Sequence, residues 1–459
     1  MASNSVCQIP ESRIIQLARI ISESVAKIDE ALSEQGLEPL SFDDGAPAGY
    51  LPSEVSGGVR DAVIDATAEL HDLLLEPLHL IKAYSGSNNS VCMQAIARYG
   101  IASMVPPGDQ MMSFADIGKR TGLGEQMAAR LLRHAMTMRV FREPEPGLVA
   151  HTKASRLLAS PEMTAWMRIG TEEMWPAATK MLDALEKWPG SQEPNETAYS
   201  LSQNSMQSIY ETIGSNPEKS ARFAWAMAVW ATRPDYSPSH VINGYDWAAL
   251  GNQNSHNHLI KVVDVGGARG HVAAALAQRF PNLDVLVQDM EMVVAGAAAA
   301  LPEQHLVRAG RVRFEAHDLF AAQTTSSAVG ADVFFFRWIL HNWADKHCVA
   351  TLRAQIPALK PGARILVMDT CMPEPGVDYY LGEKGEDVVK TRAIPLWMER
   401  DLRSEDLNMG AIFNSRERTL REWKALFTEA DPAFVLGAVT KPEGSALTVM
   451  EVMWLPSSN

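Results

Sequence analysis

Residues 261–270 read Lys-Val-Val-Asp-Val-Gly-Gly-Ala-Arg-Gly, and this stretch decides the fold class. A short run rich in valine ends at Val265 and gives way to three glycines, Gly266, Gly267 and Gly270. Such a run is typical of a buried strand. The glycines let the chain turn tightly and bring backbone amides close to a ligand. The stretch therefore predicts a strand, a glycine turn and the start of a helix.

Further β-rich runs follow this strand, and helix-like segments separate most of them. The runs cover residues 284–287, 312–316, 332–336 and 364–368. Strands and helices in alternation predict a mostly parallel sheet with helices on both faces. Two late β-rich runs, 434–440 and 446–453, predict an antiparallel hairpin at the edge of that sheet. We therefore expect a Rossmann-like α/β domain over residues 259–459.

Acidic residues follow the second and third strands. Asp289 lies 23 positions after Gly266, where a carboxylate can accept the ribose hydroxyls of a nucleoside. Together with Gly266 and Gly267, it predicts a nucleoside site. Asp318 follows the third strand, and it either reaches an adenine amino group or caps a helix.

Residues 337–345, which read Arg-Trp-Ile-Leu-His-Asn-Trp-Ala-Asp, follow the fourth strand. Open α/β sheets bind ligands beyond the carboxyl ends of their strands, and an imidazole there can act as a base at neutral pH. We therefore predict that His341 is functional. Two carboxylates can orient it and stabilise its cation, Asp369 at the end of the fifth strand and Glu417. The alternative for Glu417 is an exposed charge between two arginines.

The N-terminal part of the chain is predicted to be helical, with segments at 11–35, 59–82 and 164–188. Residues 113–158 read as two helices joined by a turn and followed by two short strands, which is a winged-helix pattern. Such a module either binds DNA or serves packing and dimerisation. With 41 Lys and Arg against 55 Asp and Glu, the net charge of −14 disfavours DNA binding. We expect four parts: a helical extension (1–58), the winged-helix part (59–189), a linker with connecting helices (190–258) and the α/β domain.

Composition excludes several classes of protein. An apolar fraction of 46% is ample for a packed core, and no stretch approaches the roughly 20 apolar residues that span a bilayer. Four widely spaced cysteines and an N-terminus without a secretory pattern predict reduced thiols and a cytoplasmic location. His341, His347 and Cys348 have no fourth ligand at a spacing that suits zinc, so we predict no metal site.

Several motifs in this order resemble the plant and fungal O-methyltransferases of small molecules. They are Asp264-Val265-Gly266-Gly267-x-x-Gly270-His271, Phe280-Pro281-Asn282-Leu283, Val287-Gln288-Asp289, Leu340-His341-Asn342-Trp343-x-Asp345 and Glu417-Arg418-Thr419-x-x-Glu422-Trp423. The resemblance covers about Val59 to the end of the chain. It implies a methyltransferase domain with a mostly parallel seven-stranded sheet and a winged-helix dimerisation domain, in a homodimer that acts on small molecules.

The resemblance also assigns roles to residues. S-adenosylmethionine would be held by the glycine turn and the residues beyond it, namely Gly266, Gly267, Asp289, Asp318, Leu319 and Arg337. His341 matches the general base, and Asp369 and Glu417 match its carboxylate partners. The chain departs from the family at Ala268, Asn342 and Asp369, where a glycine, an aspartate and a glutamate are usual, and Arg269 adds bulk and charge beside the cofactor loop.

Within the family, the chain is similar to fungal O-methyltransferase-like pericyclases of 2-pyridone alkaloid pathways. These enzymes dehydrate an alcohol to a quinone methide and steer a hetero-Diels–Alder or Alder-ene cyclisation, for which Arg337 or His341 would polarise a carbonyl. The expected pocket walls are Thr232, Trp338, Trp397, Met398, Met409 and Phe413. On this resemblance we favour a pericyclase, with an O-methyltransferase as the alternative and a winged-helix regulator third.

Overall fold

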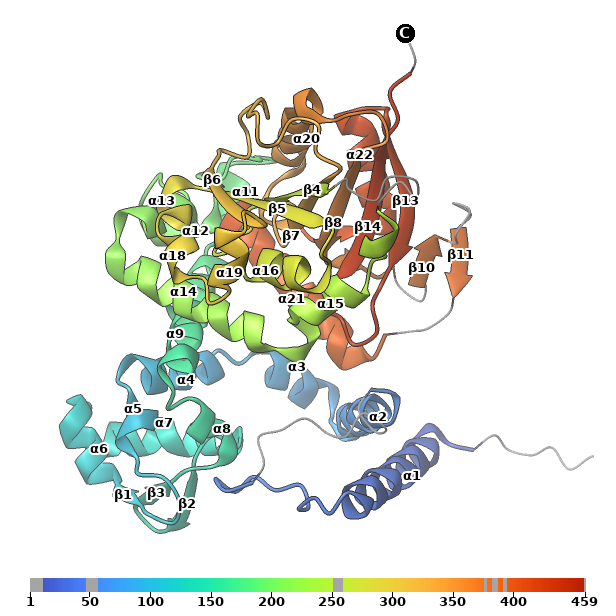
Figure 1. Ribbon diagram of the computed structural model, residues 1–459. Helices are drawn as coiled ribbons and strands as arrows, with labels where there is room; N and C mark the ends of the chain where they lie inside the picture. The colour runs from blue at the N-terminus through green and yellow to red at the C-terminus, as the bar shows by residue number, and fades with distance from the viewer. Residues whose placement is uncertain are drawn as a thin grey trace, which may run out of the picture. The chain divides into compact units, whose positions relative to one another are not determined.

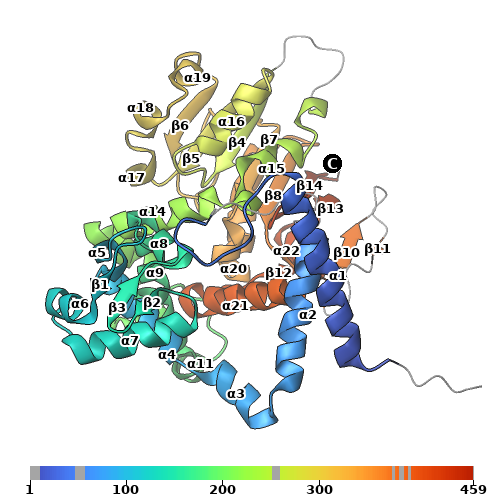
Figure 2. The ribbon, with the colours of Figure 1, turned by 90° about the horizontal axis from the view of Figure 1, so that it is seen from below.

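The computed structural model describes residues 11–46, 57–250, 259–374, 378–381, 387–390 and 394–457. The chain forms two compact units, shown as ribbons in Figures 1 and 2. The smaller unit is Met1–Trp175 with Ile394–Asp401, and the larger is Pro176–Ala393 with Leu402–Asn459. The segment that we predicted as a linker, 190–258, thus belongs to the larger unit. The finer domain boundaries stay a prediction.

The larger unit is built on a seven-stranded sheet in the order β13-β14-β8-β7-β4-β5-β6. Its strands are β4 (Ile260–Val265), β5 (Leu283–Asp289), β6 (Val312–Ala316), β7 (Val333–Arg337), β8 (Arg364–Asp369), β13 (Phe434–Thr440) and β14 (Thr448–Trp454). The strands β4 to β8 pair in parallel, and β14 is antiparallel to both β8 and β13. The predicted fold class is confirmed, and so is the antiparallel hairpin at the edge.

The strand order places the first and fourth strands of the sheet side by side. From β4 the chain proceeds outward through β5 and β6, and it then returns to place β7 on the other side of β4. Val265 lies opposite Phe336 in this pair. The segments that leave these two strands, at Gly266 and at Arg337, therefore diverge from neighbouring positions at the carboxyl edge. This reversal is where open α/β sheets bind ligands.

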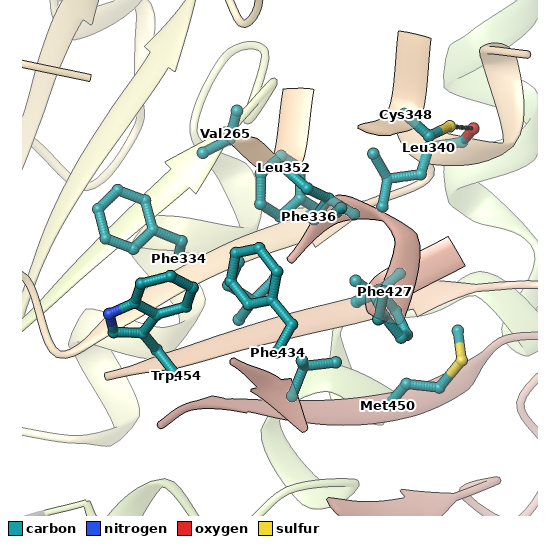
Figure 3. Close-up of a cluster of buried hydrophobic side chains, with 14 of the residues drawn as sticks. Val265, Phe334, Phe336, Leu340, Cys348, Leu352, Phe427, Phe434, Met450 and Trp454 are labelled. Atoms are coloured by element: carbon teal, nitrogen blue, oxygen red, sulfur yellow. Dashed lines mark hydrogen bonds between the residues drawn. The ribbon is translucent and has the colours of Figure 1, made fainter. Parts of the chain in front are cut away.

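Apolar side chains cover both faces of the sheet, as expected for buried parallel strands. Successive side chains of a strand point to opposite faces. Phe334 and Phe336 accordingly join the cluster in Figure 3, which also holds Phe427 of helix α22 (Leu420–Ala430). Phe335 packs on the other face with Leu276 of helix α16 (His271–Arg279). Apolar packing on both faces of the sheet thus holds the carboxyl end of β7 in place.

Helices and short elements complete the larger unit. The helices are α11 (Met181–Lys187), α12 (Ala198–Ser202), α13 (Ile209–Ser215), α14 (Pro217–Thr232), α15 (Pro238–Asn243), α16 (His271–Arg279), α17 (Glu291–Val294), α18 (Ala297–Ala300), α19 (Gln304–Arg308), α20 (Asp345–Gln355) and α22 (Leu420–Ala430). Helices α10 (Trp175–Ala178) and α21 (Leu396–Phe413) contain residues of both units. The short elements are η2 (Pro234–Tyr236), η3 (Trp247–Ala249), η4 (Leu340–Asn342), η5 (Ile356–Ala358), β9 (Cys371–Met372), β10 (Asp378–Leu381), β11 (Asp387–Lys390) and β12 (Arg418–Thr419).

The smaller unit contains the predicted winged helix. Its elements are α1 (Arg13–Glu34), α2 (Gly58–Leu74), α3 (Pro77–Ser85), α4 (Asn88–Arg98), α5 (Ile101–Met104), β1 (Met112–Ser113), α6 (Phe114–Thr121), α7 (Glu125–Thr137), β2 (Arg142–Glu145), β3 (Leu148–Ala150), α8 (Lys153–Leu157), α9 (Pro161–Arg168) and η1 (Ile169–Met174). The Ser113 hydroxyl accepts a hydrogen bond from the Asp116 amide and so caps α6. In Figure 2, α1 and α2 lie side by side.

Two predicted helical segments are interrupted. A single helix over 59–82 is wrong, because Pro77 opens a second helix and Leu75 before it is extended. The segment 164–188 is divided among α9, a π-helical turn, α10 and α11. Within the described ranges, no helix combines the length and the apolar character that a membrane span requires.

Candidate active site

Neighbouring side chains crowd the glycine turn after β4. Gly266 has a φ of 74°, and a Cβ atom there would lie 2.3 Å from Cδ1 of Ile339. A Cβ atom on Gly267 would lie 2.5 Å from Oδ2 of Asp264. The Gly266 amide also donates to the carbonyl of Gln288 at 2.7 Å. The turn is therefore held tightly against the ends of β4 and β5.

Asp289 closes this turn from the neighbouring strand. Its Oδ2 accepts from the Ala268 amide at 2.9 Å, and its Oδ1 accepts from the Met290 amide at 2.8 Å. Burial raises the pKa of Asp289, and the hydrogen bonds from these two amides lower it by less, so that the net shift is upward. Ala268, which replaces the usual third glycine, has a φ of 49°, a left-handed conformation that strains an alanine. The predicted acid and the glycine turn are thus brought together.

Asp318 follows β6, whose neighbour is β5. Its exposed carboxylate accepts from the Phe320 amide at 3.0 Å and so shapes a turn. The alternative of a helix N-cap is wrong, because a turn and not a helix follows it. Leu319 packs on the cluster of Figure 3. Contact of these two residues with a nucleoside stays a prediction.

His341 lies in the 3-10 turn η4, directly after β7, and it is paired with Glu417. The His341 Nδ1 lies 2.8 Å from Glu417 Oε1, and the two residues are 9% and 7% exposed. The alternative of an exposed Glu417 is therefore wrong. Burial lowers the pKa of His341, but the charge and hydrogen bond of Glu417 together with the charge of Asp369 outweigh it, and the net shift is upward. With Nδ1–H directed at the carboxylate, Nε2 carries the basic lone pair.

Asp369 ends β8 and is 0% exposed. Neither of its carboxylate oxygens has a hydrogen-bond partner among the described residues. Burial raises the pKa of Asp369 to about 7, although the neighbouring His341 pulls it down. Of the two predicted carboxylate partners, the structure thus pairs Glu417 with His341 and leaves Asp369 beside the pair.

Arg337 is the last residue of β7, and its guanidinium is only partly satisfied. Its Nη2 donates to the Tyr236 carbonyl at 2.6 Å, while its Nε has no partner within the described part of the chain. Burial lowers the pKa of Arg337, and the charges of Asp264 and Asp369 oppose this shift. Arg337 therefore links the edge of the sheet to the loop around Tyr236.

Unpaired buried polar atoms gather at this edge of the sheet. Among the described residues they include Oδ2 of Asp264, Nε of Arg337, both carboxylate oxygens of Asp369 and Oε2 of Glu417. Buried polar atoms are almost always hydrogen-bonded in native proteins. A ligand with its own charged groups, such as an amino-acid zwitterion, would supply the missing partners. The edge thus fits a polar cofactor beside the glycine turn.

An aromatic group of three rings, of which the sequence predicted only Trp338, stands next to His341. The indole of Trp338, whose φ is 60°, lies parallel to the imidazole with ring centres 6.0 Å apart. The Tyr236 ring is tilted by 33° against the Trp338 indole, with ring centres 4.2 Å apart, and Trp230 meets both rings edge-on. Tyr236 comes from a loop about 100 residues earlier, and no motif marks it. Only the fold could place it here.

The other predicted wall residues fall into three groups. Phe413 packs against Tyr210, with ring centres 5.5 Å apart, and Met409 is buried in the same helix α21. Trp397 and Met398 belong to the smaller unit, where the Trp397 indole donates to Asp61 at 3.2 Å. Thr232 ends α14, and its side chain lies outside the described residues. Their roles in a pocket stay predictions.

Comparison with known proteins adds family relationships. A family model described as an O-methyltransferase domain matches residues 208–431, and one described as an O-methyltransferase dimerisation domain matches residues 81–161. The chain is 41% identical to the O-methyltransferase PaMT of Phomopsis amygdali, over 96% of this chain and 97% of that protein. It is 36% identical to the O-methyltransferase pyvH of Aspergillus violaceofuscus, over 96% and 99%.

Solved structures share the fold at lower identity. OxaC has a TM-score of 0.73 at 20% identity, over 97% of this chain and 100% of that one. A structure titled "A Pericyclic Reaction enzyme" has a TM-score of 0.69 at 20% identity, over 96% and 100%. LepI in complex with SAM has a TM-score of 0.68 at 22% identity, over 95% and 100%. At these identities the likeness concerns the fold alone.

The crowding of the glycine turn predicts a specific effect of Gly267→Ala. The added methyl group would press on the Asp264 carboxylate and displace the turn, so we expect affinity for S-adenosylhomocysteine to fall at least about tenfold. Isothermal titration calorimetry measures this change. Gly214→Ala is the matched control, because a Cβ atom at Gly214 meets nothing within 4 Å. Equal affinities for both variants would contradict this account of the turn.

Proposed function

The chain belongs to the O-methyltransferase family, and from this membership we propose that it methylates a phenolic or enolic hydroxyl of a small molecule. One observation carries the proposal: the buried pair of His341 and Glu417, 2.8 Å apart, at the edge of the sheet that carries the glycine turn. A hydroxyl of this kind is acidic enough for an imidazole base to deprotonate.

S-adenosylmethionine is the cofactor of this family, and when bound it supplies an activated methyl group. The chain binds it, and its residues fit the task. We propose that the glycine turn and Asp289 hold the nucleoside part, with Asp318 and Leu319 beside it. The unpaired Nε of Arg337 and Oδ2 of Asp264 suit the carboxylate and ammonium of the methionine part.

In this proposal His341 is the general base. Its Nε2 takes the proton of the substrate hydroxyl, and the oxygen becomes a stronger nucleophile. Glu417 holds Nδ1–H, keeps the ring in the required tautomer and stabilises the imidazolium that forms. Such base catalysis contributes about 10²–10⁴-fold, and positioning of the two reactants adds to it.

The second candidate is a pericyclase, which the sequence resemblance favours. Its support is the fold shared with a structure titled "A Pericyclic Reaction enzyme", at 20% identity. Relatives 41% and 36% identical over nearly the whole chain are named O-methyltransferases, so methyl transfer now ranks first. The hypothesis of a winged-helix regulator is no longer supported, because residues 81–161 match a dimerisation domain. That match also supports a homodimer.

Product masses separate the two activities. We expect a panel of phenols and enols, incubated with the protein and S-adenosylmethionine, to yield a product heavier by one methyl group. His341→Ala should slow its formation by about 10²-fold or more, because the base is lost. His71→Ala, at an exposed histidine of the smaller unit, is the control. Liquid chromatography with mass spectrometry measures both products and rates.

Two outcomes would contradict this account. A product of unchanged or dehydrated mass with new rings, formed without S-adenosylmethionine, would support the pericyclase. Full activity of His341→Ala would show that the site lies elsewhere.

The pH dependence of methyl transfer reports on the base. His341 must be neutral to accept a proton, so kcat/KM should rise with pH through its pKa, which lies above the ordinary 6.5. Glu417→Gln removes the carboxylate that raises this pKa and leaves the burial that lowers it. The rise in kcat/KM should therefore move to lower pH in that variant. An unmoved profile would show that Glu417 does not act on the base.

A further inference from the structure

Arg418, the residue after Glu417, is a buried cation with many partners. Its side chain is 0% exposed. Its Nε and Nη2 lie 2.9 and 2.7 Å from Oδ1 of Asp345. It also donates to the carbonyls of Leu340 and Trp343, at 3.3 and 2.8 Å. One guanidinium therefore holds the chain on both sides of His341.

Two more side chains donate hydrogen bonds to the backbone carbonyls around His341. The Ser415 hydroxyl donates to the carbonyl of His341 and, at 3.0 Å, to that of Trp343. The Cys348 thiol donates to the carbonyls of Leu340 and Trp343, at 3.1 and 3.2 Å. The segment that carries Glu417 thus holds the turn that carries its partner His341 at several carbonyls.

Packing alone does not explain an arginine here. Burying a cation is unfavourable unless it is paired and hydrogen-bonded, and an apolar side chain of similar volume can fill such a space as well or better. The planar guanidinium can bond a carboxylate and two carbonyls at once, which an ammonium cannot do in the same geometry. The contacts of Arg418 converge on the turn of the base.

We propose that Arg418 is a positioning residue that fixes the His341 turn against Glu417 and places a cation beside this pair. The proposal rests on the function of His341 as a base, which is itself proposed above. Nothing in the motif comparison assigns this role to Arg418.

The charges around His341 explain why such a cation is useful. Glu417 beside β12 and Asp369 at the end of β8 both raise the pKa of His341, and Arg418 in β12 lowers it. Arg337 in β7 faces Asp369 in turn. Ionised carboxylates beside the imidazole favour its protonated form, and a protonated ring cannot accept a proton.

The test measures the titration of His341 directly. The full-length protein is labelled with ring-13C histidine, and the His341 signal is identified by its loss in His341→Asn. Arg418→Gln removes the charge and keeps an amide donor, while Arg418→Lys keeps the charge and removes the planar fork. Arg416→Gln is the matched control, because Arg416 also bonds Asp345, at 2.8 Å, but is 45% exposed. Affinity for S-adenosylhomocysteine and the melting temperature check folding.

We expect Arg418→Gln to raise the titration midpoint of His341 by about one pH unit. Arg418→Lys and Arg416→Gln should stay near the wild-type midpoint. Once a methyl-acceptor substrate is identified, we expect Arg418→Lys to lower kcat by about tenfold or more while KM for S-adenosylmethionine stays unchanged, because the His341 turn is less well placed.

Three results would overturn the proposal. The first is a folded Arg418→Gln variant in which the titration midpoint of His341 is that of the wild type, and the second is a midpoint shift in Arg416→Gln as large as that in Arg418→Gln. The third is failure of both Arg418 variants to fold, which would show that Arg418 supports the whole fold. The titration needs no turnover, so its outcome is independent of whether the protein transfers methyl groups.

Discussion

The hydrogen bond between His341 and Glu417 is the interaction on which this site depends. The two residues are 76 positions apart, and the sheet has to bring them together. Strand β8 is followed by β9, which pairs in parallel with β12 and sets Arg418 opposite Cys371. Glu417 immediately precedes β12, so this small pairing returns its carboxylate to the edge where β7 ends. Two remote segments thereby form one acid–base unit.

The same edge also carries the glycine turn. Strands β4 and β7 are neighbours, and both are fixed by side chains packed on two faces of the sheet. The turn after β4 and the base after β7 are therefore held by rigid elements, which suits a reaction that depends on placing two reactants together. Ala268 and Trp338, two residues with left-handed backbone conformations, both lie at this edge, and strained residues of this kind cluster at functional sites.

Sequence reasoning identified what is encoded locally. The strands were found because buried parallel strands are continuous apolar runs, and Gly266 and Asp289 were joined because their spacing is typical of one βαβ unit. Glu417 remained ambiguous, since two flanking arginines suggested an exposed loop, and the burial of Arg418 depends on partners about 75 residues away. Tyr236 was missed for a similar reason. The break between α2 and α3 could have been predicted from Pro77, but the apolar periodicity continues on both sides of this proline and suggested a single helix.

The central claim is that the glycine turn and the His341 turn belong to one ligand-binding site. Hydrogen–deuterium exchange with and without S-adenosylhomocysteine tests it most directly, because it reports on both segments in one experiment. The account predicts slower exchange in peptides that cover 264–270 and also in those that cover 337–343, with no change over 114–137. Protection of only one of the first two segments, at saturating ligand, would contradict it.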